Sequence, residues 1–401
     1  MKALQFCGPR QGRHFREKRL GATLRTGPKS FSTKSDSFGS GERLYNFGFK
    51  KVTEEIKSKL VHNLFSHVSN RYDLMNDLMS LRLHRCWKDQ LVKELDLFLK
   101  YHSYKMQEEI LRSEANWGRQ HGKGGAASCE ETRFGDGKVQ TGGQTGGQTD
   151  GQTGGQTDGQ TGSQPGSQTG GAASEAVNEG SAANFSACKI LDLAGGTGDI
   201  AFRILKRYKH HLEKLHQGSD FHEGENQADE FYAKFTPEII VGDVNEDMMQ
   251  VGKKRAKEMN YNRNIKWVIQ NAENLNYFED NSVDVVTLSF GIRNFTNIPK
   301  SLREIHRVLK PGGRFLCLEF SRVNCALIKP LYDAYLLKVI PLLGKVVASS
   351  ENSYKYLAES IQTFLSPEEL SQLMHQSSFR NISYSTMTMG IVAVHSGYKI
   401  G

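Results

Sequence analysis

Polar side chains follow four runs of β-forming residues, at the positions where each run ends. Carboxylate, amide and hydroxyl groups are all present there, on Asp192, Asp243, Asn271 with Glu273, and Ser289. A carboxylate accepts hydrogen bonds from a ribose diol, and an amide can pair with the edge of a base. Because ligands of an open parallel sheet bind at the carboxyl ends of its strands, these residues predict a site for a nucleoside-containing ligand.

A glycine-rich segment, AGGTGD at residues 194–199, follows the first of these runs. Gly195 and Gly196, next to Thr197, let the backbone approach a ligand closely, and the helix expected from Asp199 offers free N–H groups. A dinucleotide fold would favour GxGxxG, which seats a pyrophosphate on the helix. Asp199 instead places a carboxylate there, which suits a cationic ligand without phosphate. S-adenosylmethionine fits, because it combines an ammonium group, a ribose diol and an adenine.

Each residue also has a simpler interpretation when it is considered alone. The glycine segment could be only a tight turn, and each acid could be only the cap of a strand or part of a solvated loop. Four such positions at successive strand ends favour a ligand site over these alternatives.

A regular alternation of strand and helix patterns must position these groups. It predicts an α/β fold with a doubly wound, mostly parallel sheet and right-handed crossovers. Strands are expected at 189–193, 238–243, 265–270, 283–289 and 314–320, helices at 246–259 and 299–309, and a turn at 310–313. Near the end, a capping box at Ser366 with Pro367 starts a helix to about 376, and residues 381–399 predict an antiparallel hairpin around Gly390.

Two helical patterns precede the sheet, at 52–68 and 87–100, with a polar and aromatic turn between them. We expect residues 46–100 to form a helical lid. Residues 101–186, with their TGGQ and TDGQ repeats, predict a disordered insertion within one domain, because they hold too few apolar groups to offset the ordering entropy. A linker between two domains is the weaker alternative. A second insertion is expected at 210–236, where several histidines suggest either a solvated loop or, less readily, a metal site.

The net charge of +8 lies entirely in the first 35 residues, which hold nine Lys and Arg and a single acid, Glu17. This Arg-, Ser- and Thr-rich segment predicts a mitochondrial transit peptide at 1–35, and a basic tail that binds phosphates is the alternative. The neutral remainder argues against a nucleic-acid partner. The six cysteines are scattered without CxxC pairs, so reduced thiols and no metal are expected.

Five motifs together closely resemble the ubiquinone/menaquinone-biosynthesis C-methyltransferases, a class I S-adenosylmethionine-dependent family. They are LDLAGGTGD, GDVNEDMM, NAENL, SFGIRN and RVLKPGGRFLCLEFS, supported by YDLMNDLMS, HRCWK, YDAY, SYKYLAESI and GYKI. The resemblance covers 46–100 and 187–400, and implies a methyltransferase core at 187–400. Its cofactor positions fall on residues at the predicted strand ends: Thr197, Asp243, Asn271 with Ala272, and Ser289.

The resemblance also implies a reaction and a setting. The reaction is S-adenosylmethionine-dependent C-methylation of the ring of 2-methoxy-6-polyprenyl-1,4-benzoquinol in ubiquinone biosynthesis. The setting is the matrix side of the mitochondrial inner membrane, with peripheral membrane contact, a homodimer and a multi-subunit quinone-synthesis complex. A methyltransferase for another substrate, or a cofactor-binding scaffold without turnover, remains an alternative.

Methylation of a ring carbon requires a neighbouring hydroxyl to lose its proton, so the site should hold an oxyanion and a route for the proton. Arg293 is the first candidate for the positive group, and a structural salt bridge is its alternative. The base stays open among Asp73, Asp77, His84, Glu319 and a water molecule. Tyr72 and Asn76 could face the ring or only pack the turn. The apolar stretch 327–343, with Tyr354 and Tyr356, could form a channel for the prenyl tail, dock on a membrane, or be ordinary core.

Overall fold

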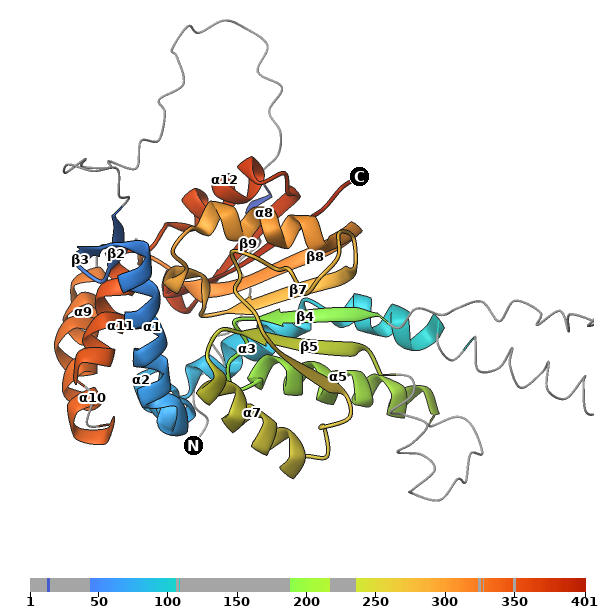
Figure 1. Cartoon of the computed structure of the whole chain (residues 1–401), viewed down its shortest axis with the longest axis horizontal. Coiled ribbons are helices and arrows are strands. Elements are labelled where there is room, and N and C mark those ends of the chain that lie inside the picture. The colour runs from blue at the N-terminus through green and yellow to red at the C-terminus, as the bar shows by residue number, and fades with distance from the viewer. Residues whose placement is uncertain are drawn as a thin grey trace, which may run out of the picture. The chain divides into compact units, whose positions relative to one another are not determined.

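The central sheet of the described chain contains eight strands, in the order β1-β9-β10-β8-β7-β4-β5-β6 (Figure 1). The computed structural model describes residues 13–14, 44–105, 108, 188–216, 236–323, 326, 328–348 and 351–401. The strands are β1 (Arg13–His14), β4 (Lys189–Leu193), β5 (Glu238–Asp243), β6 (Ile265–Ile269), β7 (Val283–Ser289), β8 (Leu309–Phe320), β9 (Arg380–Met387) and β10 (Val392–Tyr398). A separate hairpin joins β2 (Tyr45–Phe47) and β3 (Lys50–Val52).

Strands β6, β5, β4, β7 and β8 are parallel, and β10, β9 and β1 continue the sheet in antiparallel pairing. The predicted doubly wound sheet and closing hairpin are therefore confirmed, and the predicted central strands agree with the structure to within about one residue, apart from the start of β8. The predicted turn at 310–313 lies inside β8 as a bulge. Leu309 pairs with Val283 and Arg314 with Val285, so the residues between them loop out of register.

Helices cover both faces of the sheet because its buried strands alternate apolar residues between two cores. Figure 1 shows α3 (Leu83–Lys93), α5 (Asp199–His216) and α7 (Glu246–Glu258) on one face, and α8 (Ile298–Val308) and α12 (Pro367–Gln376) on the other. In β4, Ile190 belongs to the first core and its neighbour Leu191 to the second.

A group of helices from both ends of the chain stands beyond one end of the strands (Figure 1). It comprises α1 (Glu54–Val68), α2 (Tyr72–Met79), α9 (Lys329–Ala334), the π-helical segment η3 (Tyr335–Val339), α10 (Ile340–Ala348) and α11 (Glu351–Thr363). Phe47 stacks on Tyr356 with ring centroids 4.3 Å apart, and the Tyr335 hydroxyl donates to the Met79 carbonyl at 2.7 Å. The predicted amino-terminal lid is thus only half of the observed one.

Three predicted boundaries are wrong. The helix expected at 87–100 begins at Leu83, breaks at 94–95 and resumes over 96–105, so the ordered chain continues past residue 100. The insertion expected at 210–236 begins too early, because α5 continues to His216. Tyr208 and Leu212 are buried there at helical spacing, and the buried His211 contacts Asp96 at 3.3 Å, so residues 210–216 are helix and not loop. His222 lies outside the described residues, among which no group of His, Cys, Asp and Glu could hold a metal ion.

Residues 217–235, and nearly all of the predicted insertion at 101–186 beyond residue 105, lie outside the described residues, as does the leader at 1–35 apart from β1. Within the described parts of the chain, no helix combines the length and apolar character needed to cross a bilayer.

The capping box at Ser366 is confirmed. Its hydroxyl accepts from the Glu369 N–H at 3.2 Å, and the Glu369 carboxylate accepts from the Ser366 N–H at 2.7 Å. We expect Ser366→Ala to lower the free energy of unfolding by about 1 kcal/mol, because α12 loses a partner for a free N–H group. Thr53→Ala is the matched control, since Thr53 is the N-cap residue of α1 but makes no side-chain hydrogen bond to it. Chemical denaturation of both variants checks this; equal losses would contradict the assignment.

Candidate active site

All the predicted cofactor residues line one cavity at the carboxyl ends of the parallel strands. They are Gly195, Gly196, Thr197, Asp243, Asn271, Ala272 and Ser289, around a volume of about 160 Å³. β4 lies between β5 and β7, so the chain passes to opposite sides of β4 at this point. Ligands of doubly wound sheets bind at such a switch in strand order, which agrees with the prediction made from the strand ends.

The glycine loop is tied to the end of β5 by the Asp243 carboxylate. Its Oδ2 accepts from the Gly196 N–H at 2.9 Å, and its Oδ1 accepts from the Asn245 N–H at 2.8 Å. Burial raises the pKa of Asp243, although these N–H groups oppose the rise. Gly196 has a φ of +51°, and a Cβ at Gly195 would come within 2.7 Å of Asp192 Oδ2. The loop therefore needs glycine at both positions to keep this close contact between backbone and carboxylates.

Two buried polar atoms in the cavity have no hydrogen-bond partner among the described residues, Asp192 Oδ2 and Ser289 Oγ. The other carboxylate oxygen of Asp192 accepts from the Thr287 hydroxyl at 3.0 Å. Burial raises the pKa of Asp192 to about 7. Buried polar atoms are costly when unpaired, so this cavity suits a ligand that brings hydrogen-bond donors and positive charge. An ammonium group, a ribose diol and an adenine fit this donor and acceptor set.

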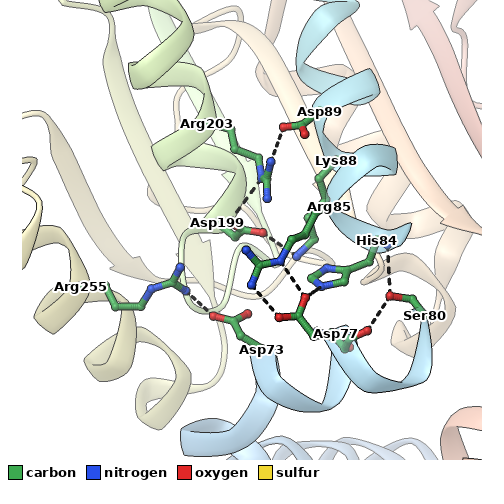
Figure 2. A network of polar contacts seen from close by, with 11 residues as sticks. Asp73, Asp77, Ser80, His84, Arg85, Lys88, Asp89, Asp199, Arg203 and Arg255 are labelled. Carbon is green, nitrogen blue, oxygen red and sulfur yellow. Dashed lines mark hydrogen bonds and ion pairs between the residues drawn. The ribbon is translucent and has the colours of Figure 1, made fainter. Parts of the chain in front are cut away.

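Asp199 lines the cofactor cavity, as expected, but its carboxylate is already paired with cations of the protein. Its carboxylate contacts the Lys88 ammonium at 2.8 Å and the Arg203 guanidinium at 3.4 Å (Figure 2). Burial alone would raise the pKa of Asp199, but these two cations outweigh it and lower the pKa to about 2. The protein itself thus compensates this charge, and Asp192 is the acid that remains for a cationic ligand group.

A second cavity, of about 480 Å³, adjoins the first and is mostly apolar. Lid helices and the loop after β7 form its walls, and Phe65, Tyr72 and Phe290 line both cavities. Tyr354 and Tyr356, predicted to line a tail channel, belong to it, together with Tyr332, Tyr335, Leu336 and Ile340. Burial raises the pKa of Tyr356 to about 12, so its hydroxyl remains neutral at physiological pH.

Arg293 lines the apolar cavity, and its side chain is 4% exposed. Its guanidinium pairs with Glu319 at 2.9 Å, donates to the Phe290 carbonyl and lies 5.4 Å from the centre of the Phe320 ring. The Nε atom is buried without a partner among the described side chains and backbone groups. Both interpretations of Arg293 therefore have a basis: it makes a buried ion pair, and one of its donors is left for a ligand.

The predicted catalytic candidates in the lid do not all reach the cavities. Tyr72 lines both, and Asn76 lines the apolar one. Asp73 lines neither cavity, and its carboxylate is bound to Arg255 at 2.6 Å (Figure 2). Asp77 and Glu319 also line neither, whereas His84 lines the apolar cavity.

Sequence reasoning missed many residues of the two cavities, among them two on α3 and one in the loop after β7. Lys88 lines the cofactor cavity, Trp87 lines the apolar one, and Phe290 lines both. Trp87 packs against Phe290 with ring centroids 6.3 Å apart. The motif HRCWK could have pointed to Lys88. His84, already a candidate, is four residues before Lys88, so the two side chains share one face of the helix.

This strand order and strand-end cavity are those of a class I S-adenosylmethionine-dependent methyltransferase, as predicted. The chain belongs to the ubiE/COQ5 methyltransferase family, whose model matches residues 52–101 and 174–399. The resemblance drawn from the motifs is therefore confirmed.

Two curated relatives carry the same name, 2-methoxy-6-polyprenyl-1,4-benzoquinol methylase, mitochondrial. The protein of Bos taurus is 35% identical over 364 residues, which cover 88% of this chain and 83% of the relative. The protein of Oryza sativa subsp. japonica is 36% identical over 359 residues, 88% of each chain. Among solved structures, a SAM-dependent methyltransferase from Aquifex aeolicus aligns with a TM-score of 0.34 and 14% identity, covering 53% of this chain and 82% of that one.

Proposed function

We propose that this protein transfers a methyl group from S-adenosylmethionine to a ring carbon of 2-methoxy-6-polyprenyl-1,4-benzoquinol in ubiquinone biosynthesis. The observation that carries the proposal is the junction of two unlike cavities. A small polar cavity with unpaired buried oxygens meets a larger aromatic one, and Phe65, Tyr72 and Phe290 line both. A polar methyl donor and a prenylated ring would meet at that junction. The names of the curated relatives support the same substrate.

The residues of the chain bind and align the two reactants. S-adenosylmethionine supplies, when bound, a methyl group already activated by the sulfonium charge. This methyl donor would be held in the polar cavity by the residues that line it, namely Asp192, Gly195, Gly196, Thr197, Asp243, Asn271, Ala272 and Ser289. Alignment of the ring carbon with the methyl group is the main contribution of the site. Arg293 supplies positive charge in a water-poor cavity, where it stabilises the oxyanion of the quinol.

The apolar cavity suits a prenyl tail, and its rim suits a membrane surface. Leu81 and Leu331 line the cavity but are 80% and 74% exposed. Exposed apolar side chains at the mouth of a lipid-sized cavity favour peripheral contact with a bilayer. We therefore propose that the tail enters from the membrane at this rim.

The cellular setting is proposed on the sequence and the names of the relatives. Residues 1–35 would act as a mitochondrial transit peptide and direct the protein to the matrix side of the inner membrane. There it would form a homodimer within a quinone-synthesis complex. A reporter fused to residues 1–35 tests the first point, and sedimentation equilibrium tests the dimer. A reporter that stays outside mitochondria, or a monomer at micromolar concentration, would refute the respective point.

The decisive assay follows labelled methyl from S-adenosylmethionine into a short-tailed 2-methoxy-6-prenyl-benzoquinol carried in phospholipid vesicles. We expect label on the ring carbon and co-sedimentation of the protein with the vesicles. The matched control is 2-methoxybenzoquinol without a tail, which should be a poor substrate because it leaves the apolar cavity unfilled. Equal transfer to the tail-less compound would favour another small phenol. Cofactor binding without any transfer would favour a non-catalytic scaffold, and absence of cofactor binding would contradict the assignment of the polar cavity.

A further inference from the structure

A histidine at the start of α3 has one ring nitrogen engaged and the other left without a partner. His84, on α3, is 5% exposed and lines the apolar cavity. Its Nε2 lies 2.8 Å from Asp77 Oδ1, whereas its Nδ1 is buried without a hydrogen-bond partner among the described residues (Figure 2). His102, His306 and His395 also have a buried ring nitrogen without a partner among the described residues, but they line neither cavity. His84 differs because it belongs to a cavity wall, where a ligand can supply the missing partner.

The Asp77 carboxylate is held in place as an acceptor by a second residue of α3, Arg85. Arg85 donates from Nε to Oδ1 at 2.7 Å and from Nη2 to Oδ2 at 2.6 Å. The hydrogen bond from Arg85 is the largest cause that lowers the pKa of Asp77 to about 2. A permanent carboxylate beside Nε2 assigns the ring hydrogen to that nitrogen, so the lone pair is on Nδ1.

The backbone around the ring is also held in place. The Ser80 hydroxyl accepts from the His84 N–H at 3.2 Å and donates to the Asn76 carbonyl at 2.6 Å (Figure 2). These contacts connect the end of α2 to the start of α3. The imidazole is thus fixed by its own backbone as well as by Asp77.

His84 lies next to the junction of the two cavities. Lys88, one helical turn further along α3, lines the cofactor cavity and is bound to Asp199. Residues four apart on a helix are neighbours on one face, so the imidazole belongs to the apolar side of the same wall.

The surroundings keep the imidazole neutral at physiological pH. Burial and the Lys88 ammonium lower the pKa of His84, while Asp77 and Asp199 oppose the decrease. Arg85 is bound to the same Asp77 carboxylate. A neutral imidazole with a free lone pair is able to accept a proton.

We propose that His84 is the general base of the methyl transfer and that Asp77 is its positioning residue. The inference rests on the proposed function, because the proton comes from the quinol. His84 Nδ1 takes the hydroxyl proton as the ring carbon bonds to the methyl carbon and the methyl–sulfur bond breaks, leaving its electron pair on sulfur. The methylated ring carbon then loses its proton to water, and the oxygen recovers a proton from His84. One proton is released for each methyl group transferred.

The other side chains that were candidates for the base fit less well, and a water molecule is the alternative that the His84→Gln variant tests. Asp73, Asp77 and Glu319 are engaged with arginines and line neither cavity. Arg293 lines the apolar cavity, but a guanidinium stays protonated in proteins and cannot accept the proton. Arg293 and His84 therefore have separate roles, the first as a positive charge and the second as the proton acceptor.

The test replaces His84 with glutamine, whose side-chain amide can still donate to Asp77 but lacks the basic nitrogen. We expect kcat to fall by about 100-fold or more, the usual contribution of a general base, while the affinity for S-adenosylmethionine is unchanged. The wild-type kcat should decrease as the pH falls through the His84 pKa, and this decrease should be absent from the His84→Gln profile.

His211 provides a matched control, because it is part of the same kind of cluster away from both cavities. It contacts Asp96 at 3.3 Å, and Asp96 is bound by Arg207 as Asp77 is by Arg85. His211→Gln should therefore leave kcat and its pH profile unchanged. Asp77→Asn should lower kcat and move the acidic limb to lower pH, since Asp77 raises the His84 pKa.

The outcomes separate this inference from the proposed function. A wild-type protein that labels no quinol contradicts the proposed function itself. A labelling wild type together with a His84→Gln variant that keeps kcat within about threefold, or keeps the acidic limb, overturns the role of His84 alone. Unchanged S-adenosylmethionine affinity in the variant verifies that it is folded, so loss of activity cannot be assigned to unfolding.

Discussion

Replacing Arg293 with methionine is expected to lower the free energy of unfolding by about 3–5 kcal/mol, because it leaves the Glu319 carboxylate buried without its partner. Glu319 is 1% exposed, and burial already raises its pKa, with Arg293 as the main opposing influence. The variant should also lose most of its turnover, since the cavity loses its positive charge. Chemical denaturation and the methyl-transfer assay measure the two effects.

A second substitution separates the two roles of Arg293. Glu319→Gln removes the buried negative charge and keeps one acceptor oxygen. In the wild type the Arg293 N–H donates to Oε2 and the Phe320 N–H donates to Oε1, so the amide oxygen replaces one of these two acceptors. The double variant Arg293→Met with Glu319→Gln should regain much of the stability, because neutral replacements of buried ion pairs are often tolerated. Its turnover should stay low. If turnover returns with stability, Arg293 is only structural, and its role at the oxyanion is contradicted.

Asp192→Asn should make the ligand-free protein more stable and weaken cofactor binding. Burial raises the folded-state pKa of Asp192 from 3.8 to about 7. This carboxyl group therefore favours the folded state below about pH 4, and that contribution is lost as the pH rises through 7. At pH 8 the substitution removes an unpaired buried charge and should stabilise the ligand-free protein by up to about 4 kcal/mol.

Binding should change in the opposite direction. A cationic ligand group loses its charged partner, so we expect the affinity for S-adenosylmethionine to fall by about 10–100-fold. Thermal denaturation with and without the cofactor, together with calorimetric titration, measures both changes. Asp247→Asn, at an exposed position in the first turn of α7, is the control for a change in net charge. Equal behaviour of the two variants would contradict the role of Asp192.

The sequence alone predicted the sheet and the strand-end residues because both are determined by residues that are close together in the sequence. Alternating apolar residues define each strand, and the polar residues that follow reach the cavity through the register of parallel pairing. Ser289 and Asn271 come together in this way without any knowledge of distant contacts. The capping box at Ser366 is local in the same sense.

The errors concern side chains whose partners are far away in the sequence. Asp199 lines the cofactor cavity as expected, but its ion pair with Lys88, 111 positions earlier, was not predicted. Asp73 was a catalytic candidate, but its carboxylate accepts a hydrogen bond from Arg255, 182 positions later. Residues 210–216 were assigned to a loop because of their charge, although Leu212 continues the apolar face of α5. Local patterns do not specify these tertiary pairs.

The early helices and the end of the chain contact each other, and this has a consequence for biosynthesis. The Trp87 indole donates to the Thr388 hydroxyl across 301 positions, and Phe47 stacks on Tyr356. At about 5–20 residues per second, a ribosome needs roughly 15–60 s to make the chain between Trp87 and Thr388. Residues on α5 cover part of the apolar face of α3 earlier, since Leu91 shares a core with Ile204. The contacts with Thr388 and Tyr356 form only when the end of the chain has been made, so the early helices stay partly uncovered until then.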